Sequence, residues 1–307
     1  GSEISQAAPL IMTGLSVAFA FKTGLFNIGA AGQYTVGIFG ALFSAIILHM
    51  PWYLCLLTAM VCGAVWGAFP GFFKAYFNVN EVITSIMFNW IGLYLVNELM
   101  YSTFKGMYDQ KTTRTYKLSS VSPSSLIPDM GLNSIFKTSS TTIAIFIAIL
   151  IAIIMYIILN KTTFGYELKA CGFNKDAAKY AGINERRNIV LSMMISGALA
   201  GIGAGLYFLS GAAEWNPQVS TELPGIGFNG IPVALLAMSN PLGVIFAAII
   251  GAHISVGGAY LPTKYFQPEI ANFIVAVIIY LCAFVMLFKS VVVSKLGRKK
   301  AKKEDVK

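Results

Sequence analysis

The stretch Ser140-Thr-Thr-Ile-Ala-Ile-Phe-Ile-Ala-Ile-Leu-Ile-Ala-Ile-Ile-Met-Tyr-Ile-Ile-Leu159 carries no charged side chain. A helix needs about 20 mainly apolar residues to cross the hydrocarbon core of a bilayer. The stretch therefore predicts a transmembrane helix, and it sets the fold class for the rest of the chain.

Similar apolar stretches recur along the sequence. They predict an all-α membrane protein, a polytopic helix bundle of about eight or nine membrane segments with short broken helices. The segment 228–238 is expected to be a half-helix, because Ser239-Asn240-Pro241 interrupts it before the next apolar stretch. The expected segments are 8–21, 30–48, 52–73, 81–101, 140–159, 189–210, 228–238 paired with 241–261, and 270–288.

Composition supports a chain that lies in lipid. Of the 307 residues, 56% are hydrophobic and 11% are charged, whereas soluble domains carry about 25% charged residues. The net charge of +9 does not indicate nucleic-acid binding, because eight of the 22 basic residues lie between Lys289 and Lys307, directly after the last apolar stretch. A basic tail at that place is typical of a cytoplasmic anchor.

The distribution of Lys and Arg predicts the orientation of the bundle. If the C-terminus is cytoplasmic and each segment crosses once, sixteen basic residues lie inside and six outside. The membrane domain is then 1–288, with an extracellular loop at 103–138, a cytoplasmic loop at 161–188 and a cytoplasmic tail at 289–307. This scheme puts residue 1 outside without a visible export signal, so we expect the natural protein to carry a further N-terminal helix.

The cytoplasmic loop contains its own helical pattern. Asn174 is a favourable N-cap, and Asp176 and Lys179 complement the helix dipole at either end. Gly182 suits the left-handed position that follows a helix. These residues predict a two-turn helix over 175–181, whose small face (Ala177, Ala178 and Ala181 beside Tyr180) suits insertion into a groove of a partner protein. A surface helix that caps the bundle is the alternative.

Small residues recur at helical spacing in three apolar stretches. Close backbone approach through such residues supplies packing energy between helices in lipid, so these stripes predict helix seams, with a dimer interface as the alternative for some of them. Glycine-rich interruptions at 24–32 and 224–230 occupy corresponding places in the two halves, as is typical of transporters with internal repeats. The stripes are Gly63, Gly67 and Gly71; Gly197, Gly201 and Gly205; and Gly243, Ala247, Gly251 and Ser255.

Five stretches of the chain resemble one transporter family. They are Gly165-Tyr-Glu-Leu-Lys-Ala-Cys-Gly-Phe-Asn-Lys-Asp-Ala-Ala-Lys-Tyr-Ala-Gly-Ile183, Ile195-Ser-Gly-Ala-Leu-Ala-Gly-Ile-Gly-Ala-Gly205, Thr23-Gly-Leu-Phe-Asn-Ile-Gly-Ala-Ala-Gly-Gln33, Val79-Asn-Glu-Val-Ile-Thr84 and Gly225-Ile-Gly-Phe-Asn-Gly-Ile-Pro-Val-Ala-Leu235. The first two resemble the permeases of bacterial ABC importers for ribose, branched-chain amino acids and nucleosides. The last three narrow the resemblance to nucleoside permeases that work with a basic-membrane-protein-type binding lipoprotein. Ala31 and Asn229 depart from this pattern, since the family commonly has Glu and Asp there.

The resemblance implies a type II-like importer permease in the bacterial cell membrane, with nucleosides as substrates. It implies ATPase subunits, a second permease subunit and an external lipoprotein as partners. It also implies that ATP and Mg²⁺ bind the ATPase chains and that no cofactor binds this one. In the family the short loop helix couples to the ATPase. The implied coupling residues are Asn174, Lys175, Ala177, Ala178, Tyr180 and Gly182.

Polar and aromatic side chains at membrane depth are the candidates for the substrate pathway. A nucleoside requires amide hydrogen-bonders and aromatic faces for its base, whereas ordinary hydrogen bonding between helices is the alternative role for such residues. His253 stands alone on its helix and is expected to be a buried hydrogen-bonding residue rather than a metal ligand. The candidates are Phe88, Asn89, Trp90, Phe228 and Asn229.

The sequence lacks the motifs of ATP binding, catalysis and metal binding. No GxxxxGK[ST] phosphate loop, no catalytic constellation and no metal-ligand spacing is present, so we expect a non-catalytic subunit without catalytic or metal-binding residues. Three alternatives remain open at this point. They are a permease for a ribose-like sugar or branched-chain amino acids, an ATP-independent channel or carrier, and a structural membrane scaffold.

Overall fold

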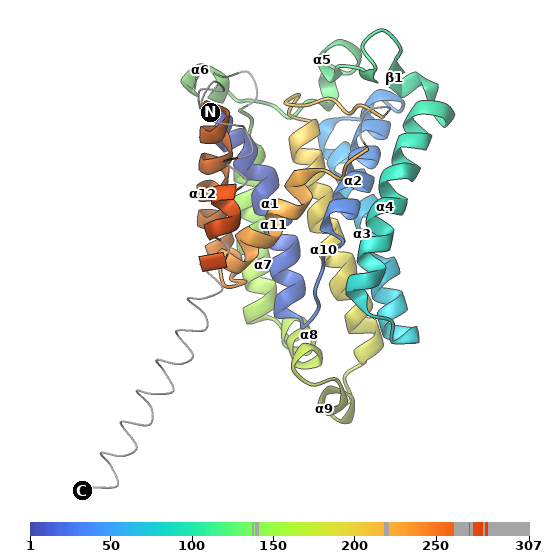
Figure 1. Ribbon diagram of the computed structural model, residues 1–307, viewed down its shortest axis with the longest axis vertical. Coiled ribbons are helices and arrows are strands. Elements are labelled where there is room, and N and C mark those ends of the chain that lie inside the picture. The colour runs from blue at the N-terminus through green and yellow to red at the C-terminus, as the bar shows by residue number, and fades with distance from the viewer. Residues whose placement is uncertain are drawn as a thin grey trace, which may run out of the picture. The chain divides into compact units, whose positions relative to one another are not determined.

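A computed structural model describes residues 1–136, 138, 141–217, 221–260, 270, 273–278, 280 and 281. The chain divides into two compact units, Gly1–His253 and Ile254–Lys307, and the first unit contains most of the described residues (Figure 1). Its helices are α1 (Ser2–Lys22), α2 (Ala30–Ile46), α3 (Trp52–Phe77), α4 (Glu81–Glu98), α5 (Leu118–Val121), α6 (Leu132–Phe136), α7 (Ala144–Lys161), α8 (Thr163–Phe173), α9 (Lys175–Tyr180), α10 (Glu185–Phe208), α11 (Gly225–Leu236) and α12 (Pro241–Ala259), the last of which continues into the second unit.

A small hairpin interrupts the helices between α4 and α5. A π-helical turn, Leu99–Thr103, prolongs α4, and a short 3-10 turn, Lys105–Met107, leads into β1 (Tyr108–Asp109). This strand pairs antiparallel with β2 (Arg114–Thr115), Tyr108 opposite Thr115. In Figure 1 the hairpin and α5 lie at the opposite end of the unit from α8 and α9.

Six helices in the described part of the chain are long and apolar enough to cross a membrane: α1, α3, α4 with its π-helical turn, α7, α10 and α12. The helices α2 and α11 are apolar but shorter, so the expected count of eight or nine segments is not reached on length. The first segment is longer than predicted, because the helix continues through the polar residues that precede Ala8. Most of the expected segment 270–288, and the whole tail 289–307, lie outside the described residues.

The predicted glycine stripes of α3 and α10 form one seam. A Cβ atom on Gly63 would fall onto the carbonyl oxygen of Gly197, and a Cβ atom on Gly201 would fall onto that of Ala59. Gly37 of α2 joins the seam, where a Cβ atom would lie 2.6 Å from the Cα of Gly201. The three helices therefore pack backbone to backbone, as small residues permit in lipid.

Burial distinguishes the centre of the bundle from its rim. Every residue of α1 from Ala7 to Ala20 is buried, whereas α4 and α7 expose large apolar side chains such as Tyr94 and Phe146. Extended apolar surfaces of this kind are rare on monomeric soluble proteins and suit contact with lipid or another membrane helix. The burial pattern thus agrees with a membrane bundle whose central helix is α1.

Candidate functional site

A non-helical segment, residues 23–29, separates α1 from α2. Thr23 begins it, and Gly24 follows with φ of +74°, a conformation that glycine adopts at little cost. The amide of Asn27 in this segment bonds reciprocally with the amide of Gln33 in the first turn of α2. The Asn27 nitrogen donates to Gln33 over 2.8 Å and the Gln33 nitrogen donates to Asn27 over 3.2 Å. Backbone of this kind is tolerated at membrane depth only where protein or a cavity surrounds it.

Hydroxyl groups of α10 hold the same segment. Asn27 donates to the Oγ of Ser196 over 2.6 Å, and Ser196 donates to the backbone carbonyl of Ser16 over 2.7 Å. Nearer the α9 end, the hydroxyls of Thr23 and Ser192 are hydrogen-bonded to each other. The segment is thus fixed to α10 at two points, through buried side chains.

Asn89 of α4 fixes the far end of the segment. Its Oδ1 accepts from the backbone nitrogen of Gly32 over 2.8 Å, and its Nδ2 donates to the carbonyl of Ile28 over 3.1 Å. The side chain is only 2% exposed. We call this pair of hydrogen bonds from Asn89 to Gly32 and Ile28 the Asn89 clamp. A Cβ atom on Gly32 would lie 2.7 Å from Asn89 Oδ1, so the clamp requires glycine at that position.

A pocket of about 290 Å³ opens beside this clamp. The volume is at the lower end of the range of small-molecule sites, about 300–1,000 Å³. It combines an amide, a carboxylate, two aromatic rings and aliphatic walls. The lining residues are Ile28, Ile86, Asn89, Trp90, Glu222, Leu223 and Phe228.

The pocket contains three of the five pathway candidates. Phe88 lies elsewhere: its ring stacks on Phe69 at 5.2 Å between centroids, and its carbonyl accepts from the Trp66 indole over 3.1 Å. Asn229 is half-buried on α11 and does not line the pocket. Glu222, which follows no motif, and Ile86, whose apolar side chain resembles an ordinary packing residue, were not predicted. Ile28 lies in the stretch 23–33 but was not among the pathway candidates.

The second glycine-rich interruption was predicted wrongly in part. Residues 225–230 are helical, and Pro224 is the N-cap of α11. The glycines here serve close packing, because a Cβ atom on Gly227 would lie 2.8 Å from that of Ala31 and one on Gly230 would lie 2.6 Å from the carbonyl of Thr13. The predicted break before Pro241 is confirmed, since Met238 and Ser239 both have positive φ.

The loop between α7 and α10 contains the expected short helix. The Asn174 side chain accepts from the backbone nitrogen of Ala177 over 3.0 Å, and Gly182 has φ of +80°. The helix α9 ends at Tyr180 rather than Ala181, which caps it. Lys175 begins it, half-buried.

The predicted small face of α9 is divided. Ala178 is 3% exposed and turns toward the protein, whereas Tyr180 is 94% exposed and Ala177 is also exposed. Phe173, directly before the helix, is 89% exposed. The surface offered to a partner is therefore aromatic, with Ala178 as an internal packing residue.

A second loop helix, α8, was not predicted. Thr162 caps it by accepting from the backbone nitrogen of Gly165 over 3.1 Å, a signal visible in the sequence. Cys171 near its end is buried, and the Asn188 amide lies 3.6 Å from its Sγ. Burial raises the pKa of the Cys171 thiol, against a smaller lowering by Asn188.

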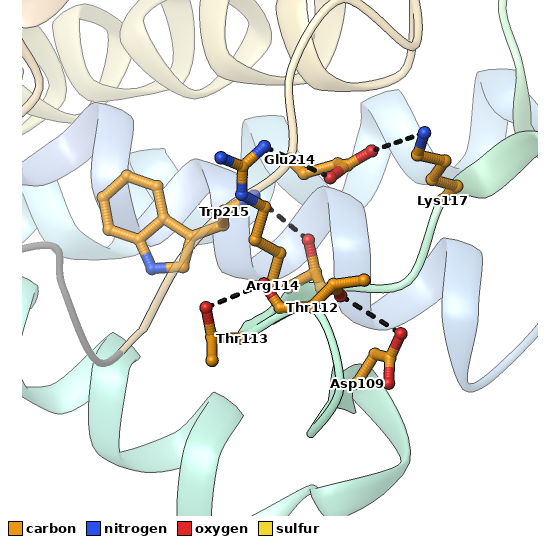
Figure 2. Close-up of polar contacts among 8 residues, drawn as sticks. Asp109, Thr112, Thr113, Arg114, Lys117, Glu214 and Trp215 are labelled. Atoms are coloured by element: carbon orange, nitrogen blue, oxygen red, sulfur yellow. Dashed lines mark hydrogen bonds and ion pairs between the residues drawn. The ribbon is translucent and has the colours of Figure 1, made fainter.

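Charged residues gather around the hairpin at the other end. The Glu214 carboxylate lies 3.7 Å from Arg114 and 3.8 Å from Lys117. Figure 2 marks both ion pairs with dashed lines. The side chain of Trp215, next to Glu214, is only 7% exposed, and its indole donates to Asn97 over 2.9 Å. The tryptophan thus anchors the 209–217 loop to α4.

His253 differs from its expected role. Its side chain is 72% exposed in this chain, and its Nδ1 lies 2.9 Å from the Glu3 carboxylate. Glu3 is too far away in sequence for periodicity to pair the two residues. Among the described residues, no cluster of three His, Cys, Asp or Glu side chains could hold a metal ion.

Known proteins resemble this chain over nearly its whole length. The guanosine ABC transporter permease protein NupP of Bacillus subtilis (strain 168) is 38% identical over 290 residues, 92% of this chain and 80% of that protein. The nucleoside ABC transporter permease protein NupB of Lactococcus lactis subsp. cremoris is 36% identical, over 99% of this chain and 86% of that protein. The glucose ABC transporter permease protein TsgB13 of Haloferax volcanii is 28% identical, over 86% of this chain and 70% of that protein.

No solved structure matches the chain. A family model described as the branched-chain amino acid transport system / permease component matches residues 2–283. With apolar helices long enough to cross a membrane and relatives that share most of its length, the chain belongs to this family of transport permeases.

Proposed function

We propose that this chain is the permease subunit of an ATP-driven ABC importer and forms the translocation pathway for nucleosides. The observation that carries the proposal is the 38% identity, over 92% of the chain, to a relative named as a guanosine permease. The pocket beside Asn89 supports the substrate class, because it offers aromatic faces and polar groups together.

Pocket chemistry suits a nucleoside in a specific way. The side chains of Trp90 and Phe228 are 42% and 36% exposed, so each presents a ring face on which a base can stack. The Glu222 carboxylate at the same pocket accepts hydrogen bonds from ribose hydroxyls. The Asn89 amide bonds the backbone of the 23–29 segment and of Gly32, so it fixes the part of the pocket wall that it lines.

The architecture we propose is a type II-like bundle of eight or nine membrane segments within 1–288. The hairpin loop, 103–138, faces outward, and the 161–188 loop and the 289–307 tail face the cytoplasm. The excess of basic residues on the loop and tail side supports this orientation.

ATPase subunits would dock on α9 and its exposed aromatic neighbours, and ATP and Mg²⁺ would bind those subunits. A second permease subunit and an external binding lipoprotein would complete the complex. This chain itself would hold no cofactor and catalyse no reaction. Alternating access would follow from closure of the ATPase subunits against the coupling loop.

Uptake into proteoliposomes tests the proposal. The complex with its ATPase subunits and lipoprotein should accumulate labelled nucleosides when ATP is supplied, and a hydrolysis-deficient ATPase subunit serves as the control. Uptake of ribose or glucose without nucleoside uptake would identify a sugar permease instead. Transport by this chain alone, without ATP, would identify a carrier or channel, and an assembled complex that transports nothing would identify a scaffold.

A further inference from the structure

One contact joins the 161–188 loop, which contains α8 and α9, directly to the non-helical segment 23–29. A Cβ atom on Gly172, in the last turn of α8, would lie 2.5 Å from the carbonyl of Thr23 and 2.7 Å from the backbone nitrogen of Gly24. In the other direction, a Cβ atom on Gly24 would fall onto the Cα of Gly172. The two backbones therefore touch with no side chain between them.

On the loop side of this contact, α8 is joined to α9 by hydrogen-bonded backbone. Asn174 alone separates α8 from α9, and its backbone nitrogen still donates to the carbonyl of Ala170 over 3.1 Å. The same residue caps α9 through its side chain. A displacement of α9 consequently reaches Gly172 through continuous hydrogen-bonded backbone, without a flexible linker.

On the other side of the contact, the 23–29 segment runs from Gly24 to the pocket. The segment that begins at Thr23 ends where Asn89 binds the carbonyl of Ile28, and both Ile28 and Asn89 line the pocket. The backbone nitrogen of Thr23 still donates to the carbonyl of Phe19, and residues 24–29 then span this distance without the hydrogen bonds of a continuous helix. The segment is thus held at one end by Gly172 and at the other by the pocket wall.

Burial and backbone conformation single out this place. Thr23 is 4% exposed and hydrogen-bonds to Ser192 of α10, and Gly24 has a left-handed φ of +74°. Gly172 and Gly24 remain open to solvent on their other sides, which leaves room for the contact to shift. Elements that switch between states combine such fixed anchors with residues that absorb backbone rotation.

We propose that the Gly24–Gly172 contact transmits the movement of α9 to the pocket. Gly24 and Gly172 are positioning residues in this mechanism, and Thr23 holds the start of the segment against α10 through Ser192. The inference rests on the proposed function, since it needs an ATPase partner to move α9. A displacement of Gly172 shifts the start of the 23–29 segment, and Asn89 converts that shift into a change in the pocket wall.

The test measures whether nucleotide on the ATPase subunits changes the pocket. A Phe228→Cys reporter is placed in a background with Cys55, Cys62, Cys171 and Cys282 replaced by alanine, and the assembled complex is labelled with a maleimide with and without ATP and vanadate. We expect nucleotide to change the labelling rate by about fivefold or more, within the usual range of coupling between sites. With Gly172→Ala, the response should fall below about twofold while complex assembly and ATP hydrolysis persist.

Two controls separate this role from simple packing. Gly251→Ala should keep the full response, because a Cβ atom there meets only Val233 at 3.7 Å, an ordinary contact. If Gly172→Ala prevents assembly, Thr23→Val and Thr23→Ser are compared, and only the valine variant should lose the response because it lacks the hydroxyl.

A full response in Gly172→Ala, or in Thr23→Val where that pair is used, would overturn the proposal. So would the absence of any response in the parent complex. Nucleoside uptake by the same complex, carried out with Phe228 intact, reports separately on the proposed function.

Discussion

At the scale of single residues, Trp90 should govern substrate affinity. Stacking of a base on an aromatic ring contributes about 1–3 kcal/mol, so Trp90→Ala should weaken the apparent affinity for nucleosides about 5- to 150-fold, and Trp90→Phe should weaken it less. Concentration-dependent uptake by the assembled complex measures this. Ile91→Ala is the matched control, because Ile91 is 48% exposed on the same helix and does not line the pocket. Equal losses in both variants would exclude a stacking role.

The pH dependence of maleimide labelling at Cys171 should reflect the raised pKa of its thiol. Only the thiolate reacts with maleimides, and burial raises the pKa of this thiol above its ordinary value of 9.0. Labelling of Cys171 in a background without the other cysteines should therefore be slow at pH 7 and still rise with pH above pH 9. An Ala177→Cys variant without Cys171 provides an exposed thiol in the same loop. Similar pH profiles for the two thiols would contradict the expectation.

At the scale of elements, α9 should be necessary for coupling but not for insertion. Tyr180 is 94% exposed, so Tyr180→Asp should abolish ATP-driven uptake by opposing the docking of an ATPase subunit, and the variant should still insert in the membrane. Uptake and membrane content are measured side by side, with Ser119→Asp near the hairpin as the control. Ala178→Arg, in contrast, should disturb the fold itself, because Ala178 is buried within the chain. Unchanged uptake by the Tyr180→Asp variant would show that the ATPase subunit does not dock on α9.

The seam between α3 and α10 should be intolerant of added volume. Gly201→Ala places a methyl group on the Ala59 carbonyl, and overpacking of this kind typically costs about 1–3 kcal/mol. Thermal unfolding of the solubilised protein should therefore occur at lower temperature than in the parent. Gly251→Ala, which meets only an ordinary contact, should leave the unfolding temperature nearly unchanged. If the two variants unfold alike, the seam is looser than its geometry indicates.

Local chemistry explains which elements were predictable. The bounds of α9 were predicted to within one residue, because Asn174, Asp176 and Gly182 act on neighbouring backbone. The hydrogen bond between Thr23 and Ser192 joins residues 169 positions apart, and neither hydroxyl carries a signal in the sequence. The same holds for the contact between Gly24 and Gly172, which only the packing of α8 reveals.

The pocket was predictable in part for the same reason. Asn89 and Trp90 stood out because polar and aromatic side chains at membrane depth need a role. Phe88 was grouped with them by adjacency, yet successive residues on an α-helix point about 100° apart. Three consecutive side chains cannot all face one pocket, and Phe88 accordingly joins the aromatic cluster on α3.

At the scale of the whole molecule, the orientation of the bundle can be measured directly. Two cysteines introduced in a background without native cysteines, Ser119→Cys near the hairpin and Ala177→Cys on α9, report on its two ends. In right-side-out vesicles, a membrane-impermeant maleimide should label the Ser119→Cys variant and not the Ala177→Cys variant, because basic residues favour the cytoplasmic side. Inside-out vesicles should reverse the pattern. The opposite pattern would invert the proposed orientation.

The side chains that hold the 23–29 segment have a consequence for the energy source of transport. Thr23, Asn27, Gln33, Asn89, Ser192 and Ser196 are all amides or hydroxyls. None of these groups ionises near neutral pH. Moving one elementary charge through a membrane potential involves about 2.3 kcal/mol per 100 mV, but a rearrangement of neutral dipoles transfers no net charge. When these side chains rearrange, no formal charge therefore moves across the bilayer, and the membrane voltage acts only on the orientation of their dipoles.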